Sequence, residues 1–164
     1  MMTSADAKAF ARVQHAGQAD RAGAPYIEHL ERVAAAAEMR ARHAQQAGLD
    51  LDPEAVAQAA WLHDVIEDTG TTADDLRRLG YATPVIEMVE LLTKPPGHQT
   101  YEERIATIID SGNLGAILIK LSDNEDNNDP VRGLPEGSER LTAQYTASMV
   151  RLHRAAAALG YSGP

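Results

Sequence analysis

The sequence predicts an all-α protein that folds as a single-domain helical bundle over residues 1–164. Two observations carry the fold class. Residues that favour helices, above all Ala, Leu, Glu, Arg and Gln, dominate the composition. Glycine and proline recur at intervals that divide the chain into helix-sized segments. The length suits one domain with its own hydrophobic core, and no internal repeat is visible.

The first half of the chain is expected to hold four helices, each delimited by recognisable residues. They cover 5–16, 27–47, 53–68 and 73–79. Asp52 can cap the third helix with Pro53 at its first position, a favoured arrangement. Thr71 or Thr72 can cap the fourth.

The second half is expected to hold four more helices, over 83–92, 101–110, 114–127 and 138–159, with loops at 95–97 and 130–137. The apolar run at 117–121 is also compatible with a buried strand. The length of the segment and its helical neighbours favour a helix.

The charge balance limits the kinds of partner. The chain has 15 Lys and Arg against 24 Asp and Glu, a net charge of -9. A nucleic acid polymer is therefore not an expected partner, because such proteins present a basic face. An acidic protein can still bind an anionic substrate through a bound cation.

Other compositional features concern the compartment. The chain has no cysteine, which excludes disulfides and thiolate metal sites. It has neither a stretch of about 18 apolar residues nor a signal-peptide pattern. We therefore expect a cytoplasmic protein with no membrane partner. The sequence leaves the oligomeric state open.

The strongest local signal is a group of four ionisable residues in an apolar segment, His63, Asp64, Glu67 and Asp68. Buried carboxylates and imidazoles are costly unless they are paired or bind a metal. On a continuous helix Glu67 lies one turn beyond His63, and Asp68 lies one turn beyond Asp64. The pair His63–Asp64 alone is equally compatible with a satisfied pair in the core.

Two further segments deliver polar groups in a similar way. Asp123 and Asn127 follow an apolar run and stand four residues apart, and His29 follows a rigid Gly-Ala-Pro-Tyr turn at the start of a long helix. Each has an ordinary alternative explanation, a fraying helix end for Asp123 and a structural histidine for His29.

Together these segments resemble the HD phosphohydrolase superfamily, and within it the RelA/SpoT-type hydrolase domain and the small alarmone hydrolases. The resembling stretches occur in family order and are HAGQ at 15–18, GAPYIEH at 23–29, LHDVIEDT at 62–69, LTK at 92–94 and IKLSD at 119–123, with Asn127. They cover roughly residues 5–130.

The resemblance implies an all-α bundle that binds one divalent ion, usually Mn²⁺ or another divalent transition metal. The implied metal ligands are His29, His63, Asp64 and Asp123. Two imidazoles and two carboxylates form a mixed nitrogen and oxygen site that suits Mn, Fe, Co or Ni.

The resemblance also implies roles around the metal. Glu67 and Asp68 would activate or place the attacking water, and Asn127 would lie near the nucleotide. Arg21, Lys94 and Lys120 are candidates for phosphate contact, although each could be a solvated surface cation.

The expected partner is a small nucleotide substrate. The resemblance implies hydrolysis of the 3′-pyrophosphate of guanosine tetra- or pentaphosphate, or of a close adenine analogue. One alternative is an HD phosphatase that acts on another nucleotide or a phosphorylated cofactor. An alternative of another class is an inactive helical module that senses nucleotides or binds a protein.

Two positions depart from the alarmone hydrolase pattern. Asp20 stands where that family usually has an arginine, and Asn124 stands where it has another. We expect each change to remove a contact to phosphate or base and to leave the metal site intact.

Overall fold

The computed structural model describes residues 1–132, 135 and 137–164, and over these residues its regular structure is entirely helical. The predicted all-α class is thereby confirmed, and the one-domain organisation stays a prediction. In chain order the helices are α1 (Ser4–Gln14), α2 (Tyr26–Gln46), α3 (Pro53–Leu62), α4 (Val65–Asp68), α5 (Ala73–Leu79), α6 (Thr83–Leu92), α7 (Tyr101–Asp110), α8 (Leu114–Asn127), the 3₁₀ helix η1 (Pro130–Arg132) and α9 (Glu139–Ala158).

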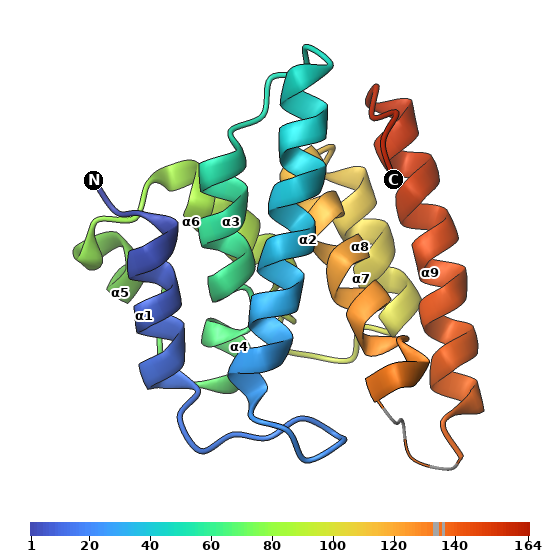
Figure 1. Cartoon of the computed structure of the whole chain (residues 1–164), viewed down its shortest axis with the longest axis horizontal. Helices are drawn as coiled ribbons and strands as arrows, with labels where there is room; N and C mark the ends of the chain where they lie inside the picture. The colour runs from blue at the N-terminus through green and yellow to red at the C-terminus, as the bar shows by residue number, and fades with distance from the viewer. Residues whose placement is uncertain (133–134, 136) are drawn as a thin grey trace.

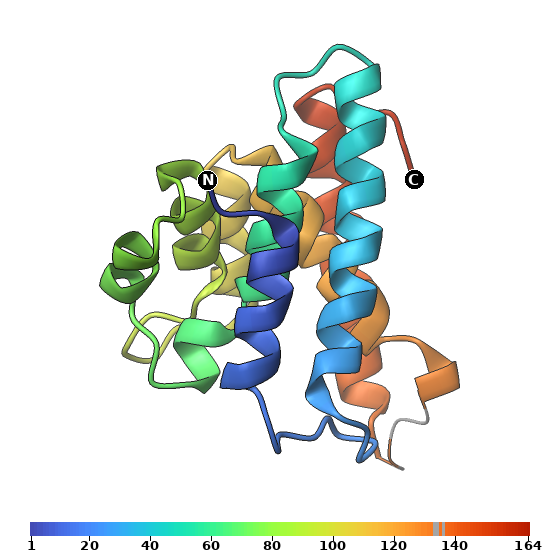
Figure 2. The same cartoon turned by 60° about the vertical axis from the view of Figure 1, so that its left-hand side comes forward.

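The long helix α2 lies at the centre of the bundle (Figure 1). It packs against α3 on one side and α8 on another, while α1 covers α3 and α9 covers α8. Turning the molecule shows α5 and α6 on the outer side of α3, far from α9 (Figure 2). Three elements that carry candidate site residues, α2, the end of α3 and α8, therefore meet in the middle of the fold.

Buried alanines occur on both α2 and α3, which pack against each other. Ala34, Ala37 and Ala41 of α2 are buried, as are Ala59 and Ala60 of α3. Small side chains at a contact allow two helix axes to approach each other. Larger apolar groups complete the core around this seam, namely Leu30, Val33, Leu62, Ile117, Leu118 and Leu121.

The expected helix starts are largely confirmed. Asp52 accepts a hydrogen bond from the Glu54 amide with Pro53 at the first position of α3. Thr72, and not Thr71, caps α5 in a capping box with Asp75. Segment 114–127 is a helix, as expected, and its run of apolar residues is buried because α8 lies between several neighbours.

The prediction of one continuous helix over 53–68 is wrong, because the helix is interrupted at His63 and Asp64. His63 Nδ1 lies 2.7 Å from the carbonyl oxygen of Ala60, one of the last carbonyls of α3. Side chains of this kind can satisfy the terminal carbonyls of a helix. Asp64 has φ -103° and ψ 0°, which starts a tighter turn into α4.

The loop expected at 130–137 is also partly wrong, since 130–132 form the 3₁₀ helix η1. The rest of that expected loop includes residues 133, 134 and 136, which lie outside the described residues. Across the part of the chain that the structure describes, no helix is long and apolar enough to cross a bilayer.

The start of α8 provides a test of the packing. A Cβ added at Gly115 would lie 2.5 Å from Met88 Sδ and 3.2 Å from Val56 Cγ2. We expect Gly115→Val to lower the free energy of unfolding by about 1–3 kcal/mol, because overpacking forces neighbouring side chains to shift. Urea unfolding followed by circular dichroism measures the change.

Gly70→Ala is the matched control, because a Cβ at Gly70 meets no atom within 4 Å and no positive φ is involved. Wild-type stability of the Gly115→Val variant would contradict the close approach of α8 to α3 and α6.

Candidate metal and substrate site

Four side chains expected to bind metal converge at the centre of the bundle. One ligand atom each from His29, His63 and Asp64 lies within 4.8 Å of the others. Asp123 Oδ1 of α8 lies 3.0 Å from His29 Nε2 and 3.5 Å from His63 Nε2. The structure thus brings together residues of α2, of the α3–α4 turn and of α8.

Both imidazoles are held with the same nitrogen facing the cluster. His63 Nδ1 lies against the Ala60 carbonyl at 2.7 Å, and His29 Nδ1 lies 2.6 Å from Asp126 Oδ2. A partner that accepts a hydrogen bond from Nδ1 fixes the tautomer whose Nε2 carries a lone pair. Each ring therefore presents Nε2 to the centre, as a metal ligand does.

The electrostatics of the cluster show strong mutual stabilisation of charge. Burial alone would lower the pKa of His63, but the negative charges of Asp64 and Asp123 outweigh it and raise that pKa well above its usual value. Burial alone would raise the pKa of Asp64, yet the neighbouring His63 lowers it to about 2. Burial is likewise outweighed at Asp123, whose pKa is lowered chiefly by Lys120. Asp64 and Asp123 are therefore both held as carboxylates, which is the form that binds a cation.

The residues present fit a divalent cation. In the described structure His63 Nε2 is buried beside Asp64 Oδ2 at 3.0 Å and Asp123 Oδ1 at 3.5 Å, yet it forms no well-directed hydrogen bond with either, although buried polar atoms normally form one. Two imidazole nitrogens and two carboxylates are the donor set that transition metals of intermediate hardness accept. A cation would satisfy the nitrogen and neutralise the two acids together.

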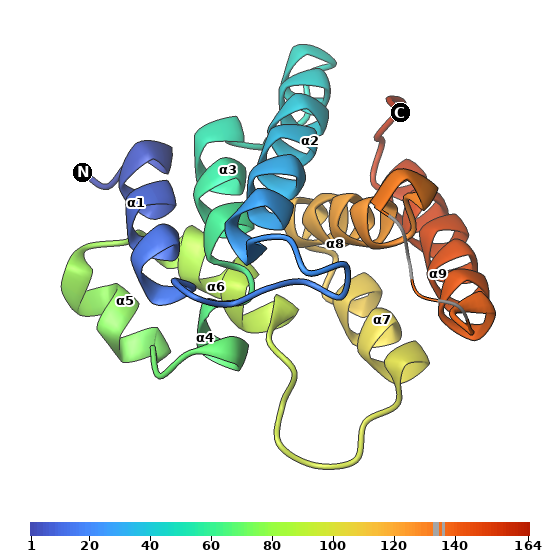
Figure 3. The same cartoon turned by 60° about the horizontal axis from the view of Figure 1, so that its bottom comes forward.

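Asp64 and Asp123 of this cluster line a cavity of about 400 Å³ at the lower end of the bundle, whereas His29 and His63 are not among its lining residues. Figure 3 views this end, where the loop between α1 and α2 passes below the helices and the loop between α6 and α7 projects outward. The cavity is lined by Ala19, Asp20, Arg21, Ala22, Tyr26, Asp64, Glu67, Asp68, Tyr101, Arg104, Lys120, Asp123, Asn127, Arg132, Leu141, Gln144 and Tyr145.

The two predicted acid/base residues lie on α4 and face this cavity. Glu67 Oε1 accepts a hydrogen bond from the Lys94 amide at 2.7 Å and is 3.4 Å from Arg104 Nη2. Burial, with added repulsion from Asp64 and Glu67, raises the pKa of Asp68 to about 6. Glu67 is thus anchored, whereas Asp68 is a comparatively basic carboxylate.

The predicted substrate-binding residues fall into two groups. Arg21, Lys120 and Asn127 line the cavity. Lys120 is buried and forms an ion pair of 3.0 Å with Asp123 Oδ2, and Asn127 Nδ2 donates to Asp123 Oδ1 at 3.2 Å. Both therefore support a predicted metal ligand from within α8.

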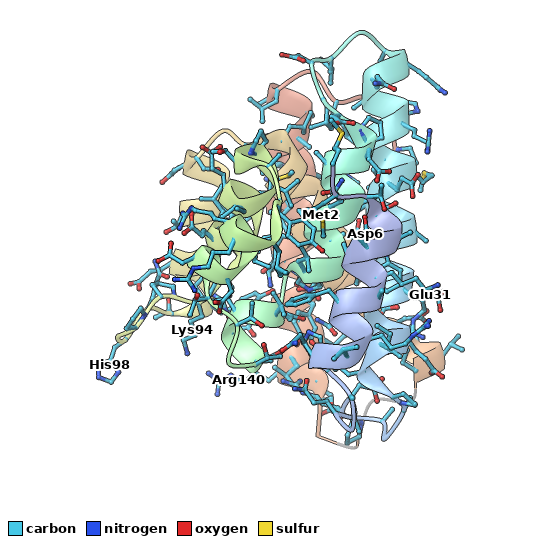
Figure 4. The ribbon with its side chains drawn as sticks, turned by 90° about the vertical axis from the view of Figure 1, so that its left-hand side faces the viewer. Met2, Asp6, Glu31, Lys94, His98 and Arg140 are labelled. Atoms are coloured by element: carbon cyan, nitrogen blue, oxygen red, sulfur yellow. The ribbon has the colours of Figure 1, made fainter. Side chains whose placement is uncertain are left out.

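Lys94 is placed differently. Its side chain is exposed and is not among the cavity-lining residues, and Figure 4 shows Lys94 and His98 at the periphery of the molecule. Lys94 contributes to the site through its backbone amide, which holds Glu67.

Several residues of the site were missed by the sequence analysis. Tyr26 donates a hydrogen bond to Asp64 Oδ2, and Asp126 supports His29. Arg104, Tyr101 and Tyr145 form part of the cavity wall. Tyr26 could have been found from the sequence, because it belongs to one of the stretches that resemble the family. No motif or spacing in the sequence indicates Arg104 or Tyr145.

The stretch at 15–18 contacts residues that carry or adjoin the site. His15 Nδ1 lies 2.8 Å from Gln18 Oε1, and Gln18 Nε2 donates to the carbonyl oxygen of Asp68 at 3.2 Å. The ring of His15 also lies 5.2 Å from that of Tyr26. These contacts connect the end of α1 and the residues after it to α4, which carries Asp68, and to α2, which carries Tyr26.

The two departures from the alarmone hydrolase pattern have structural partners. Asp20 is not a free acid, because Oδ2 pairs with Arg132 Nη2 at 2.7 Å. Asn124 is fully buried and accepts a hydrogen bond of 2.6 Å from the Tyr101 hydroxyl, so it links α8 to α7.

Comparisons with known proteins agree with this geometry. SpoT of Escherichia coli, named as a bifunctional (p)ppGpp synthase/hydrolase, is 33% identical in an alignment 147 residues long that covers 83% of this chain and 19% of that protein. A protein of Aquifex aeolicus named guanosine-3′,5′-bis(diphosphate) 3′-pyrophosphohydrolase is 32% identical in an alignment 123 residues long that covers 72% of this chain and 16% of that protein. The chain thus spans about a fifth of the length of such relatives.

Solved structures and family patterns extend the comparison. A structure described as that of a metazoan ortholog of SpoT that hydrolyzes ppGpp and plays a role in starvation responses aligns with a TM-score of 0.69 at 22% identity. The alignment covers 95% of this chain and 92% of that one, which establishes the likeness of the fold. The HD domain pattern matches residues 26–128, well over half of the chain. This chain is a member of the HD domain family.

Proposed function

We propose that this chain is a metal-dependent phosphohydrolase that removes the 3′-diphosphate from guanosine 3′,5′-bis(diphosphate). The observation that carries the proposal is the convergence of His29, His63, Asp64 and Asp123. The two aspartates of this group line a cavity that Glu67 and Asp68 also line. The names of the relatives in Escherichia coli and Aquifex aeolicus support the choice of substrate.

The proposed chemistry divides the work between the ion and the protein. A divalent cation, for which we propose Mn²⁺, would lower the pKa of water and withdraw charge from a phosphoryl group. Glu67 would orient the attacking water and accept its proton, since its other contacts fix the position of the carboxylate. Asp68 lies on the same turn as a second proton acceptor with a pKa of about 6.

The cavity also has features suited to a nucleotide. Tyr101 and Tyr145 lie edge to face, with ring centroids 6.1 Å apart, and give one wall an apolar character. Arg21, which follows Asp20 in the α1–α2 loop, also lines the cavity. An apolar wall suits a base or sugar, and a cationic group suits a phosphate.

A second candidate is a phosphatase that acts on a nucleotide with fewer phosphates. The observation that favours it is the pairing of cavity cations. Lys120 pairs with Asp123 at 3.0 Å, Arg132 with Asp20 at 2.7 Å and Arg104 with Glu67 at 3.4 Å. These pairs leave less positive charge for two diphosphates. A nucleotide panel with Mn²⁺ separates the candidates, because the first releases pyrophosphate and the second releases orthophosphate.

Loss of a ligand tests the metal site. We expect His63→Ala to weaken Mn²⁺ binding by roughly 100-fold or more and to abolish turnover, because even outer residues of metal sites change affinity by about 10–100-fold. Isothermal titration calorimetry on protein stripped with a chelator measures the affinity.

His98→Ala is the control for that experiment, because His98 lies far from the cluster at the periphery (Figure 4). Equal Mn²⁺ affinity in the wild type and His63→Ala would refute the assignment of His63. A wild type that binds no divalent metal would instead favour the inactive helical module.

The role of Glu67 gives a separate prediction. We expect Glu67→Gln to keep Mn²⁺ affinity near that of the wild type and to lower kcat by about 10²–10⁴-fold, the usual contribution of general acid–base catalysis. The amide keeps an oxygen that can accept from the Lys94 amide but cannot take up a proton. Pyrophosphate release at saturating nucleotide measures kcat.

Glu31→Gln provides the matched control, since Glu31 forms an exposed ion pair with Lys8 on the outer face of α2. A Glu67→Gln variant with wild-type kcat would exclude Glu67 as the proton acceptor and leave Asp68 as the alternative.

A further inference from the structure

Arg132 contacts three residues around the site, Asp20, Asp126 and Asn127, although it lies beyond the stretches that resemble the family. Its Nη2 is 2.7 Å from Asp20 Oδ2, and its Nη1 is 2.9 Å from Asp126 Oδ2. Nη1 also donates to the Asp126 carbonyl at 3.0 Å and to Asn127 Oδ1 at 3.2 Å. One guanidinium of η1 thus connects the α1–α2 loop to the end of α8.

The contact with Asp20 determines the shape of the α1–α2 loop. Asp20 Oδ1 accepts hydrogen bonds from the amides of Ala22 and Ala24, at 2.9 and 3.0 Å, and Oδ2 is left for Arg132. The loop leads directly into α2, which carries Tyr26 and His29. Figure 3 shows this loop crossing the end of the bundle from α1 toward α2.

The contact with Asp126 reaches a predicted metal ligand. Asp126 Oδ2 lies 2.6 Å from His29 Nδ1 as well as 2.9 Å from Arg132 Nη1. The carboxylate that fixes the His29 ring is therefore itself fixed by Arg132. Partners of this kind, one bond removed from a metal, set the orientation and basicity of the ligand.

We propose that Arg132 is a positioning residue that joins the α1–α2 loop and His29 into one unit around the cavity. The proposal rests on the proposed function, because it takes His29 as a metal ligand and the cavity as the substrate site. Both Nη groups are engaged by carboxylates, so the role that we assign to Arg132 operates through Asp20 and Asp126, although Arg132 also lines the cavity.

The charges explain why an arginine is needed at this position. The side chains of Asp20 and Asp126 are only 5% and 8% exposed. Buried acids without a cation are strongly unfavourable, and removing one partner of such a pair leaves an uncompensated charge. Arginine can hold both acids because its planar guanidinium presents several donors in a fixed geometry.

The chain offers a matched comparison for the contact with Asp126. Arg32 Nε lies 2.6 Å from Asp126 Oδ1, but its side chain is 42% exposed and it is not among the cavity-lining residues. Arg32→Gln therefore removes one cation from the same acid without affecting Asp20. Arg42→Gln, which breaks an exposed pair with Glu38, controls for loss of charge alone.

The test uses Mn²⁺ and guanosine 3′,5′-bis(diphosphate) as probes on the full chain. We expect Arg132→Gln to weaken the Mn²⁺ Kd about 10-fold, within the range for outer residues of metal sites, and to raise KM several-fold. Asp20→Asn should raise KM while keeping the Mn²⁺ Kd within about twofold of the wild type, because it affects the loop alone. Arg32→Gln should change the Kd less than Arg132→Gln does.

Three results would overturn the proposal. They are a wild-type Mn²⁺ Kd in Arg132→Gln, equal effects of Arg132→Gln and Arg32→Gln on both Kd and KM, and a wild-type KM in Asp20→Asn. If circular dichroism shows that Arg132→Gln does not fold, the KM of Asp20→Asn decides the question.

Calorimetry separates this proposal from the proposed function, because the Mn²⁺ Kd is measured without nucleotide. A wild type that binds Mn²⁺ but cleaves no nucleotide refutes the proposed activity, and the comparison of Kd values still decides the role of Arg132. A wild type that binds no Mn²⁺ overturns both.

Discussion

The structure depends on one electrostatic constraint, the burial of two carboxylates beside two imidazoles at the centre of a helical bundle. Asp123 and His63 are 5% and 2% exposed, and Asp64 lies directly beside them. Burying unpaired charge is expensive. Contacts with the surrounding protein offset this cost. Lys120 forms an ion pair with Asp123, Tyr26 donates a hydrogen bond to Asp64, and Asp126 pairs with His29. Each supporting contact also fixes the orientation of a predicted ligand.

Helix α8 shows how one element can serve both the core and the site. Its apolar residues Ile117, Leu118 and Leu121 are fully buried, and Lys120, Ser122 and Asp123 are buried beside them. Ser122 accepts a hydrogen bond from Arg40 of α2 and Asn124 Oδ1 accepts one from Tyr101 of α7, whereas Asn124 Nδ2 has no partner within the described structure. A buried polar network of this kind is favourable only when its members are paired. The site is therefore rigidly connected to the fold.

The contacts that the structure shows for the departures from the alarmone hydrolase pattern alter the interpretation of these residues. Asp20 was expected to remove a contact to phosphate or base that an arginine would make. Instead it forms part of a closed set of contacts with Arg132 and the backbone of its own loop. Three basic residues that line the cavity, Arg104, Lys120 and Arg132, are thus paired with acids. This balance is the main physical difference to consider when substrates are compared.

The sequence by itself determined the all-α class and most helix boundaries, because these follow from composition, capping residues and helix breakers that are local in the chain. The four residues that converge were indicated by the resemblance of their motifs to a known family, since each motif alone had an ordinary structural explanation. The prediction of a continuous helix was wrong at His63, where Nδ1 of the side chain lies against the Ala60 carbonyl and α3 ends. Only the tertiary structure decided the partners of Asp20, Asn124 and His29. The contact between Asp20 and Arg132 spans 112 positions, and such pairings depend on how helices pack and leave no periodic signal in the sequence.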